Sequence, residues 1–499
     1  MSMMTRGVVV IHGQSAHVLP GEMLATVANS IANALENAGG KVDRAMDSTT
    51  ATGILCVTRP GQSAPSDEFH FADIGWSAAL PAASAQVVLK WMLKLGPREA
   101  WRVVRGLWTN AANDRFAGEG RSDYPARRFT RLVFIAELIP ITAAIGLIYA
   151  LAVVLSPLIY AIYMLTSVRS TTLRGTTGPF TTALHQLDPF LQSVLGESWR
   201  FVEDGMWAAD IRGLATGPII AFLEDPTIAE IIIIGHSAGA GVAYDTLAEG
   251  RPVAAAVALH PKPLTLVTLG GANNRFYWLA KESRTSPDTR RLASEPISHH
   301  ITGIPTDGPR ALASTDEAKA ALRGRFFWLN IFARLDFVPA GPLLPEVIRT
   351  ARIDPCQLKE RPVINEDDLL RDHFDYFVND DLVAPRLVRA LFGGEYPWEG
   401  ADRFHSPAIT RDRVRARTRG VAWLDALGIL LVSFVLGWIA AFIVSSTWRG
   451  FFDHDAGALI AINLGPLGHA ITFLVALLGP ISLAYFLYSA IRGWWFDTA

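Results

Sequence analysis

Cysteine is scarce in this sequence, and so is charge. Cys56 and Cys356 are the only thiols in 499 residues, which is too few for a disulfide framework and favours a reducing compartment. No Cys-x-x-Cys pair or His/Cys cluster predicts a zinc site, so we expect neither a metal nor a cofactor. Only 18% of the residues are charged and the net charge is -2, which gives no electrostatic basis for binding nucleic acid.

No signal peptide is predicted either, because the apolar run near the amino terminus is too short for one. Hydrophobic residues, in contrast, are abundant: they make up 50% of the chain. Three long apolar runs lie at 132–165, 421–446 and 470–491. The last two reach the ~20 residues that cross a bilayer core of about 30 Å. Buried core helices are the alternative reading of such runs.

The flanking charges suggest an orientation in the membrane. The segment "RDRVRARTRG" before the second run carries five arginines, whereas the linker between the second and third runs carries one. Arginine-rich flanks lie on the cytoplasmic side of a membrane. We therefore expect an integral protein of a bacterial inner membrane, with its main domain on the cytoplasmic side and the lipid bilayer as a partner.

The first apolar run must return to the side from which it came. Segments expected to form one sheet lie on both sides of it, so a single crossing is excluded. Prolines at 140 and 157 favour a hairpin that spans or re-enters the bilayer. Upstream, residues 89–110 interleave tryptophans with basic residues, as in a helix lying at the membrane interface or an ordinary surface helix. The expected organisation is 1–130 and 169–410 as two parts of one domain, 131–168 as a membrane hairpin, and 411–499 as a pair of transmembrane helices.

Outside the apolar runs, strand-like and helical segments alternate. "GVVVIHG", "TGILCVTR", "EFHFADIGW", "IAEIIII", "LTLVTLGG" and "RFFWLNIF" are typical of strands, and helical patterns follow the first and fourth of them. Strands joined by helical crossovers predict an α/β fold: a mostly parallel sheet with helices on both faces. A polar stretch at 281–325 is either a lid or a mobile excursion.

The run of four isoleucines leads into Gly235-His236-Ser237-Ala238-Gly239. A Gly-x-Ser-x-Gly turn between a strand and a helix strains the backbone at the serine and lifts its hydroxyl above the sheet, and small neighbours let the helix pass close to the strand. The backbone N–H of Ala238 then points to where an oxyanion forms. The alternative is a chance occurrence in a chain with 41 glycines.

A second oxyanion donor is expected in the turn after the first strand, "IHGQS". The backbone N–H of Gln14 is the natural candidate, with Gly13 allowing a close approach. An ordinary glycine turn is the competing interpretation, and the longer His-Gly-Gly-Gly version of this motif is absent.

These motifs, with "WLNIFARLDFVP" and "RDHFDYFVN", resemble the α/β-hydrolase superfamily, in particular its membrane-associated lipase- and esterase-like members. The resemblance implies a catalytic triad in the order Ser, Asp, His. Ser237 is then the nucleophile, Asp336, just after a strand, the acid, and His373 the base. Rival acids are Asp354, Asp367, Asp368 and Asp372, the last expected to be solvated or a local cap; rival histidines are His405, His454 and His469.

The function implied is that of a membrane-anchored serine hydrolase, which cleaves carboxylic esters or thioesters, including those of lipids, through an acyl-enzyme. A non-catalytic hydrolase-like scaffold or regulatory module on a membrane anchor is the alternative from another class. Activation of Ser237 separates the two.

Overall fold

The computed structural model divides the chain into two compact units. The first comprises Met1–Trp91, Arg105–Glu119 and Arg174–Pro407, and contains every strand and every helix that carries a label below. The residues that the structure describes are 3–13, 21–47, 50–76, 101–109, 201–202, 204–282, 296–304, 316–333, 336–363, 365, 371–380, 382–393 and 398.

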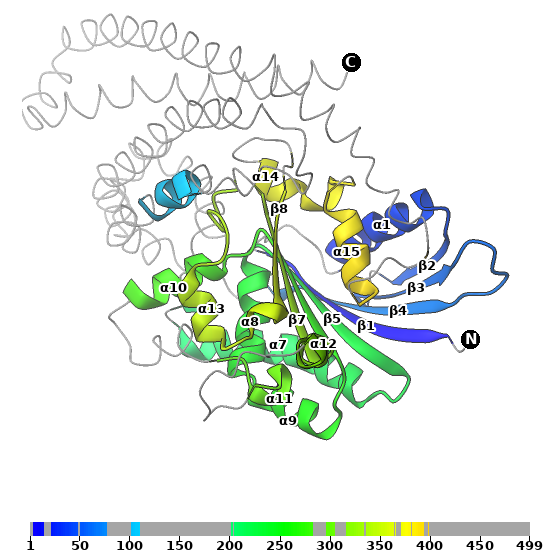
Figure 1. Cartoon of the computed structure of the whole chain (residues 1–499), viewed down its shortest axis with the longest axis horizontal. Helices are drawn as coiled ribbons and strands as arrows, with labels where there is room; N and C mark the ends of the chain where they lie inside the picture. Colours follow the sequence, from blue (N-terminus) through cyan, green and yellow to red (C-terminus); the bar gives the residue numbers. More distant parts are fainter. Residues whose placement is uncertain are drawn as a thin grey trace, which may run out of the picture. The chain divides into compact units, whose positions relative to one another are not determined.

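An eight-stranded, mostly parallel sheet forms the centre of the first unit (Figure 1). Its spatial order is β2-β3-β4-β1-β5-β6-β7-β8. The pairings from β4 to β8 are parallel, while β3 runs antiparallel to both of its neighbours. The strands are β1 (Met4–Ile11), β2 (Lys41–Asp47), β3 (Thr52–Thr58), β4 (Asp67–Ile74), β5 (Ile228–His236), β6 (Leu264–Leu269), β7 (Phe326–Ala333) and β8 (Leu358–Val363).

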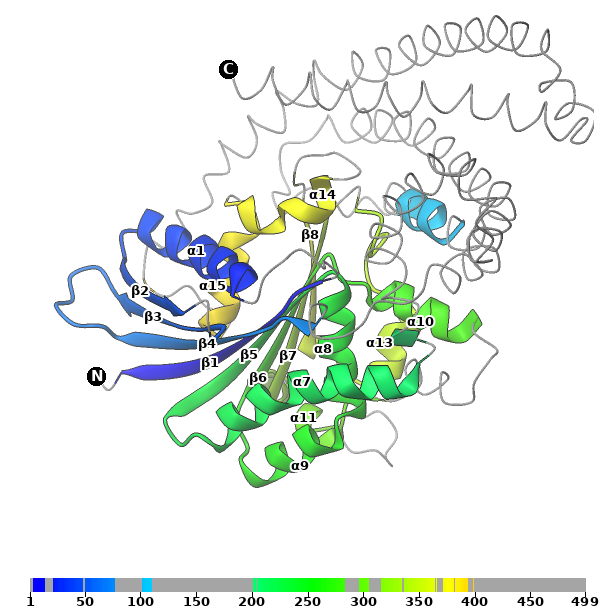
Figure 2. The same ribbon diagram turned by 180° about the vertical axis from the view of Figure 1, so that it is seen from behind.

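Helices cover both faces of the sheet (Figures 1 and 2). α1 (Glu22–Asn37) and α15 (Ala384–Leu391) pack together on one face, and α7 (Gly205–Glu224) and α8 (Ala238–Glu249) lie on the other. The remaining labelled helices are α9 (Arg251–Leu259), α10 (Asn273–Glu282), α11 (His299–Thr302), α12 (Asp316–Arg325), α13 (Pro345–Ala351), η2 (Pro355–Gln357), α14 (Arg371–Phe374) and η3 (Asp375–Val378). The expected α/β fold with a mostly parallel sheet is therefore confirmed.

The central strands are apolar on both faces because both faces are covered. Residues 8–11 of β1 and 231–234 of β5 are all at most 1% exposed. Val8 and Val10 join the core formed with α1 and α15, so the alternate residues of the strand face the opposite side. The burial of both faces explains the run of four isoleucines. A strand with one exposed face would instead alternate apolar and polar residues.

Two strands were not expected from the sequence, β2 and β8, and both are edges of the sheet. Their sequences, "KVDRAMD" and "LKERPV", are polar and lack the apolar character by which the other strands were recognised. An edge strand exposes one side to solvent, and Pro362 is tolerated there because one row of backbone groups needs no partner strand.

The parallel register brings the carboxyl ends of the central strands together. Ile11 pairs with Gly235, His236 with Leu269, and Leu269 with Ile331. Residues that directly follow β1, β5, β6 and β7 therefore meet at one edge, where sites of parallel α/β sheets are built.

The expected membrane segments, the hairpin 131–168 and the helix pair 411–499, lie outside the described residues. Within the described ranges, no helix is both long enough and apolar enough to cross a membrane. Of the segment 89–110, residues 101–109 are described as a helix with Val103 and Leu107 buried and Trp101 67% exposed. The polar stretch 281–325 is described only in part; α12, within it, buries none of its residues.

Candidate active site

Ser237 occupies a strained turn between β5 and α8. Its φ is 56° and its ψ is -126°, a combination that residues other than glycine rarely adopt. The strand ends at His236 and the helix begins at Ala238, so one residue makes the whole turn. The backbone N–H of Ser237 donates to Leu269 O of the neighbouring strand at 3.0 Å, which fixes the strained residue to the sheet.

Three glycines let other backbone segments approach this turn. A Cβ on Gly235 would lie 2.6 Å from Ala240 Cα, and one on Gly13 would lie 2.5 Å from Ser237 Cβ. A Cβ on Gly239 would collide with the carbonyl oxygen of Ile11. The spacing Gly-x-Ser-x-Gly is thus a requirement of close packing between β1, β5 and α8.

Replacing Gly239 by alanine is expected to destabilise the fold by about 3 kcal/mol or more, because the added methyl group meets backbone that cannot move aside. The Gly213→Ala change in α7 is a matched control, since a Cβ there meets nothing within 4 Å. Urea unfolding of both variants measures the difference. Equal stabilities would contradict the close approach of Gly239 to β1.

A chain of hydrogen bonds links the three residues proposed from the sequence. Ser237 Oγ lies 2.8 Å from His373 Nε2, and His373 Nδ1 lies 3.0 Å from both carboxylate oxygens of Asp336. A carboxylate only accepts, so Nδ1 carries a hydrogen and Nε2 is free to accept the hydroxyl proton of Ser237. Asp336 is fully buried and His373 is 4% exposed.

The Asp336 carboxylate has two further donors besides the imidazole. Val338 N–H donates to Oδ1 at 2.9 Å, and the Tyr376 hydroxyl donates to Oδ2 at 2.8 Å. A buried carboxylate needs such donors to compensate for the hydration that it has lost. Sequence reasoning missed Tyr376; the available signal was its position three residues after His373, which is one helical turn.

His236, the residue before the serine, supports the main chain of His373. Its Nε2 lies 3.1 Å from His373 O, and the two imidazole rings stack with centroids 5.3 Å apart. Burial lowers the pKa of His236 to about 3, helped by the nearby His373. The ring therefore stays neutral, with Nε2 donating to the carbonyl.

The remaining predicted residues have different outcomes. Ala238 is the first residue of α8, so its N–H has no acceptor within the helix. Gln14 lies outside the described residues, as do the rivals Asp367, Asp368, His405, His454 and His469. Asp354 caps η2 by accepting from Cys356 N. Asp372 is fully buried, so the expectation that it is solvated is wrong: the short helix turns its side chain inward beside His373.

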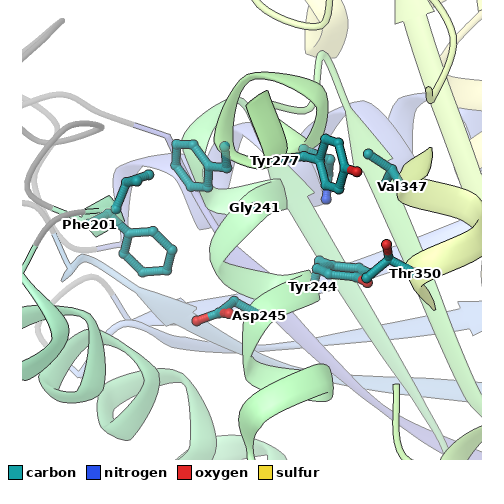
Figure 3. A pocket seen from close by; sticks show the side chains of 10 residues that line it. Phe201, Gly241, Tyr244, Asp245, Tyr277, Val347 and Thr350 are labelled. Carbon is teal, nitrogen blue, oxygen red and sulfur yellow. The ribbon is translucent and has the colours of Figure 1, made fainter. Parts of the chain in front are cut away.

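A small cavity of about 20 Å³ lies against α8, one turn beyond Ser237 (Figure 3). Gly241, Tyr244 and Asp245 of α8 line it, together with Phe201, Val202, Asn273, Phe276, Tyr277, Val347 and Thr350. Asp245 points to the side of Phe201 and Tyr244 to the side of Thr350. A space of this size holds about one water molecule.

Asp245 is a buried acid whose carboxyl group contacts Arg212 of α7. Arg212 Nη1 lies 2.7 Å from Asp245 Oδ2, while Asp245 Oδ1 has no hydrogen-bond partner. Burial raises the pKa of this carboxyl to about 7 although Arg212 lowers it. We therefore interpret Asp245 as a structural residue of α8.

Wild-type stability relative to the Asp245→Asn variant is expected to fall as pH rises from about 4 to about 7. In this window the unfolded chain has released the proton, since an unperturbed Asp has a pKa near 4, whereas the folded chain still holds it. The loss amounts to about 4 kcal/mol for a pKa of about 7. Urea unfolding of both proteins at pH 4.5 and pH 8 measures it. A difference that does not change with pH would contradict the burial of this charge.

No group of three or more His, Cys, Asp or Glu side chains suited to a metal ion is found in the described part of the chain. Comparison with known proteins finds no matching family model, no matching curated protein and no matching solved structure. The geometry at Ser237 is therefore the basis for a functional interpretation.

Proposed function

We propose that this chain is a serine hydrolase of the α/β-hydrolase type, which cleaves carboxylic esters or thioesters through an acyl-enzyme on Ser237. One observation carries the proposal: the continuous hydrogen-bonded path from Ser237 Oγ through His373 to the buried carboxylate of Asp336. Nucleophile, base and acid follow the geometry that activates a serine hydroxyl.

In the proposed reaction, His373 Nε2 takes the hydroxyl proton as Ser237 Oγ attacks the substrate carbonyl carbon. The negative charge that develops on the carbonyl oxygen is stabilised by the N–H of Ala238 at the start of α8. His373 then gives its proton to the departing alcohol or thiol, which leaves the acyl group on Ser237. Water attacks this ester with His373 again as base, and its proton returns to Ser237 Oγ. Asp336 holds Nδ1–H and stabilises the imidazolium at both stages.

The positions of these residues on the sheet support the α/β-hydrolase type. The nucleophile follows β5, the acid lies three residues after the end of β7, and the histidine follows β8. The chain order Ser, Asp, His is that of this fold class. The strain at Ser237 supports a catalytic role over a purely structural scaffold, because strained backbone of this kind is concentrated at active sites.

An apolar rim beside the catalytic imidazole supports a hydrophobic substrate. The rings of Phe374 and Phe337 lie 5.2 Å and 5.7 Å from the His373 ring. Phe374 is 66% exposed, and Val378, four residues later, is 68% exposed. Exposed apolar groups of this size are found where an apolar ligand binds. We therefore favour esters with long acyl chains, including lipids.

The membrane location is part of the same proposal and rests on the sequence. The apolar runs at 421–446 and 470–491 and the arginines before them support an anchor in a bacterial inner membrane, with the hydrolase domain on the cytoplasmic side. An anchored enzyme of this kind meets its lipid substrate at the bilayer.

Hydrolysis of p-nitrophenyl esters from acetate to decanoate tests the proposal. We expect the full-length protein to hydrolyse them, and kcat/KM to rise with acyl length. Phe374→Ser should lower kcat/KM about tenfold for decanoate and little for acetate, because about 1.4 kcal/mol of apolar contact is lost only with the long chain.

Leu259→Ser is the matched control, since Leu259 is also exposed but is the last residue of α9, which leads into the amino end of β6. It should leave both rates unchanged. No hydrolysis by the wild type would refute the enzymatic proposal. Equal losses of the two esters in Phe374→Ser would refute the apolar rim alone.

A further inference from the structure

We infer that Tyr376 is a positioning residue for the catalytic acid: its hydroxyl ties the Asp336 carboxylate to the end of β7 and shares the negative charge of that carboxylate. The inference rests on the proposed hydrolase function. It assigns a role to a residue that neither touches the substrate nor belongs to the triad.

The direction of the two hydrogen bonds of Tyr376 is fixed by their partners. Ala333 N–H donates to the Tyr376 oxygen at 2.6 Å. A backbone N–H can only donate, so the direction of this bond is certain. The hydroxyl hydrogen therefore points to Asp336 Oδ2, 2.8 Å away. Because Ala333 is the last residue of β7, the carboxylate is held by a group that is itself anchored to sheet backbone.

Packing leaves the tyrosine no other position. Tyr376 is fully buried. Gly270, at the end of β6, has a φ of +54°, and a Cβ there would lie 2.6 Å from the Tyr376 ring and 2.7 Å from Asp336 Oδ2. Because Gly270 has no side chain, the phenol and the carboxylate can both lie close to its backbone. Such enclosure is what holds a catalytic group within the narrow range of productive geometries.

The phenol keeps its proton over the whole working range. Burial raises the pKa of Tyr376 well above its ordinary value, and the nearby Asp336 raises it further. The residue is therefore a permanent donor. A charge-assisted hydrogen bond of this kind, away from water, is stronger than one between neutral groups.

Asp336 and His373 bind and release the serine proton as a pair, and the loss of the Tyr376 donor is expected to affect this pair. The pair carries a charge of -1 when it is ready to accept the serine proton and none after it has bound one, so a donor to the carboxylate favours the ready state. Other titratable groups face this pair: His236 from β5, which stays neutral, and Asp372, which is next to His373 and raises the pKa of Tyr376. Neither replaces the lost donor.

The experiment compares Tyr376→Phe with Tyr244→Phe, a buried tyrosine on α8. The pH dependence of kcat/KM is measured with p-nitrophenyl butyrate on the full-length protein. We expect Tyr376→Phe to lower kcat about 10- to 100-fold with little change in KM, and to move the acidic limb of the profile up by about one pH unit. Tyr244→Phe should leave the acidic limb in place.

A second variant covers the case in which Tyr376→Phe does not fold. Incorporation of 3-fluorotyrosine at position 376 retains both hydrogen bonds but makes the phenol a stronger donor, so the acidic limb should move to lower pH. An unchanged limb in this variant, or equal shifts in Tyr376→Phe and Tyr244→Phe, would overturn the inference.

Fluorophosphonate labelling of the wild type separates the two levels of the proposal. If Ser237 is labelled and the acidic limb does not respond to position 376, the role of Tyr376 is refuted and the hydrolase function stands. If Ser237 is not labelled at any pH, the hydrolase function is refuted, and the inference on Tyr376 with it.

Discussion

Replacing Ser237 by alanine is expected to lower kcat for ester hydrolysis by about 10⁴- to 10⁶-fold. The variant keeps the helix start, the N–H of Ala238 and the apolar rim, but it has no atom to attack the carbonyl carbon. Residual hydrolysis would come from oxyanion stabilisation and binding alone. Alanine also fits the tight turn, because it is no larger than serine.

Ser66→Ala is the matched control for this loss. Ser66 precedes β4 and makes its hydrogen bonds with Asp67 and Val57 O, at the end of the sheet opposite the carboxyl ends of the strands. We expect its kcat to stay within about twofold of the wild type, since surface polar changes have small effects. Comparable losses in the two variants would mean that Ser237 contributes to folding rather than to attack.

Replacing Asp336 by asparagine is expected to lower kcat about 10⁴-fold. Both carboxylate oxygens already accept a donor, from Val338 N–H and from the Tyr376 hydroxyl. In the asparagine variant, an NH₂ group replaces one of these oxygens, whichever way the amide is oriented. The NH₂ group then points its hydrogens at a donor, either Val338 N–H or the Tyr376 hydroxyl, and also at His373 Nδ1–H. The imidazole is then favoured in the other tautomer, with the hydrogen on Nε2, where it blocks acceptance of the serine proton.

Asp354→Asn provides the comparison for Asp336→Asn. Asp354 is a buried aspartate whose side chain caps η2, and asparagine preserves such a cap. Its kcat should remain close to that of the wild type. Stopped-flow or steady-state rates with p-nitrophenyl butyrate measure both variants. A large loss of kcat in Asp354→Asn with little loss in Asp336→Asn would refute the assignment of Asp336 as the acid.

The site could be proposed from the sequence because its main residues have strong local signals. The strand-turn-helix pattern around Ser237 is set by close packing, and the end of an apolar strand marks Asp336. His373 required only chain order and a polar segment. The structure brings these three side chains within hydrogen-bond distance, and their catalytic roles remain predictions for experiment.

Other parts of the molecule depend on tertiary contacts that have no local signal. Tyr376 contributes through an approach to Asp336 and Gly270, residues that are distant in the sequence. Asp372 is buried because α14 turns it inward, although its surroundings in the sequence are polar. The edge strands β2 and β8 were missed because the alternation and apolar character that indicate a strand are weak where one side needs no cover.

The most direct test of the account is the site at which a fluorophosphonate binds covalently to the full-length protein. Peptide mapping by mass spectrometry after labelling of the native protein locates the adduct. We predict a single phosphonyl group on Ser237 in the wild type, with labelling slowed strongly in Asp336→Asn. An unlabelled Ser237 in a protein that still hydrolyses esters, or an adduct on another residue, would contradict the assignment of this hydroxyl as the nucleophile.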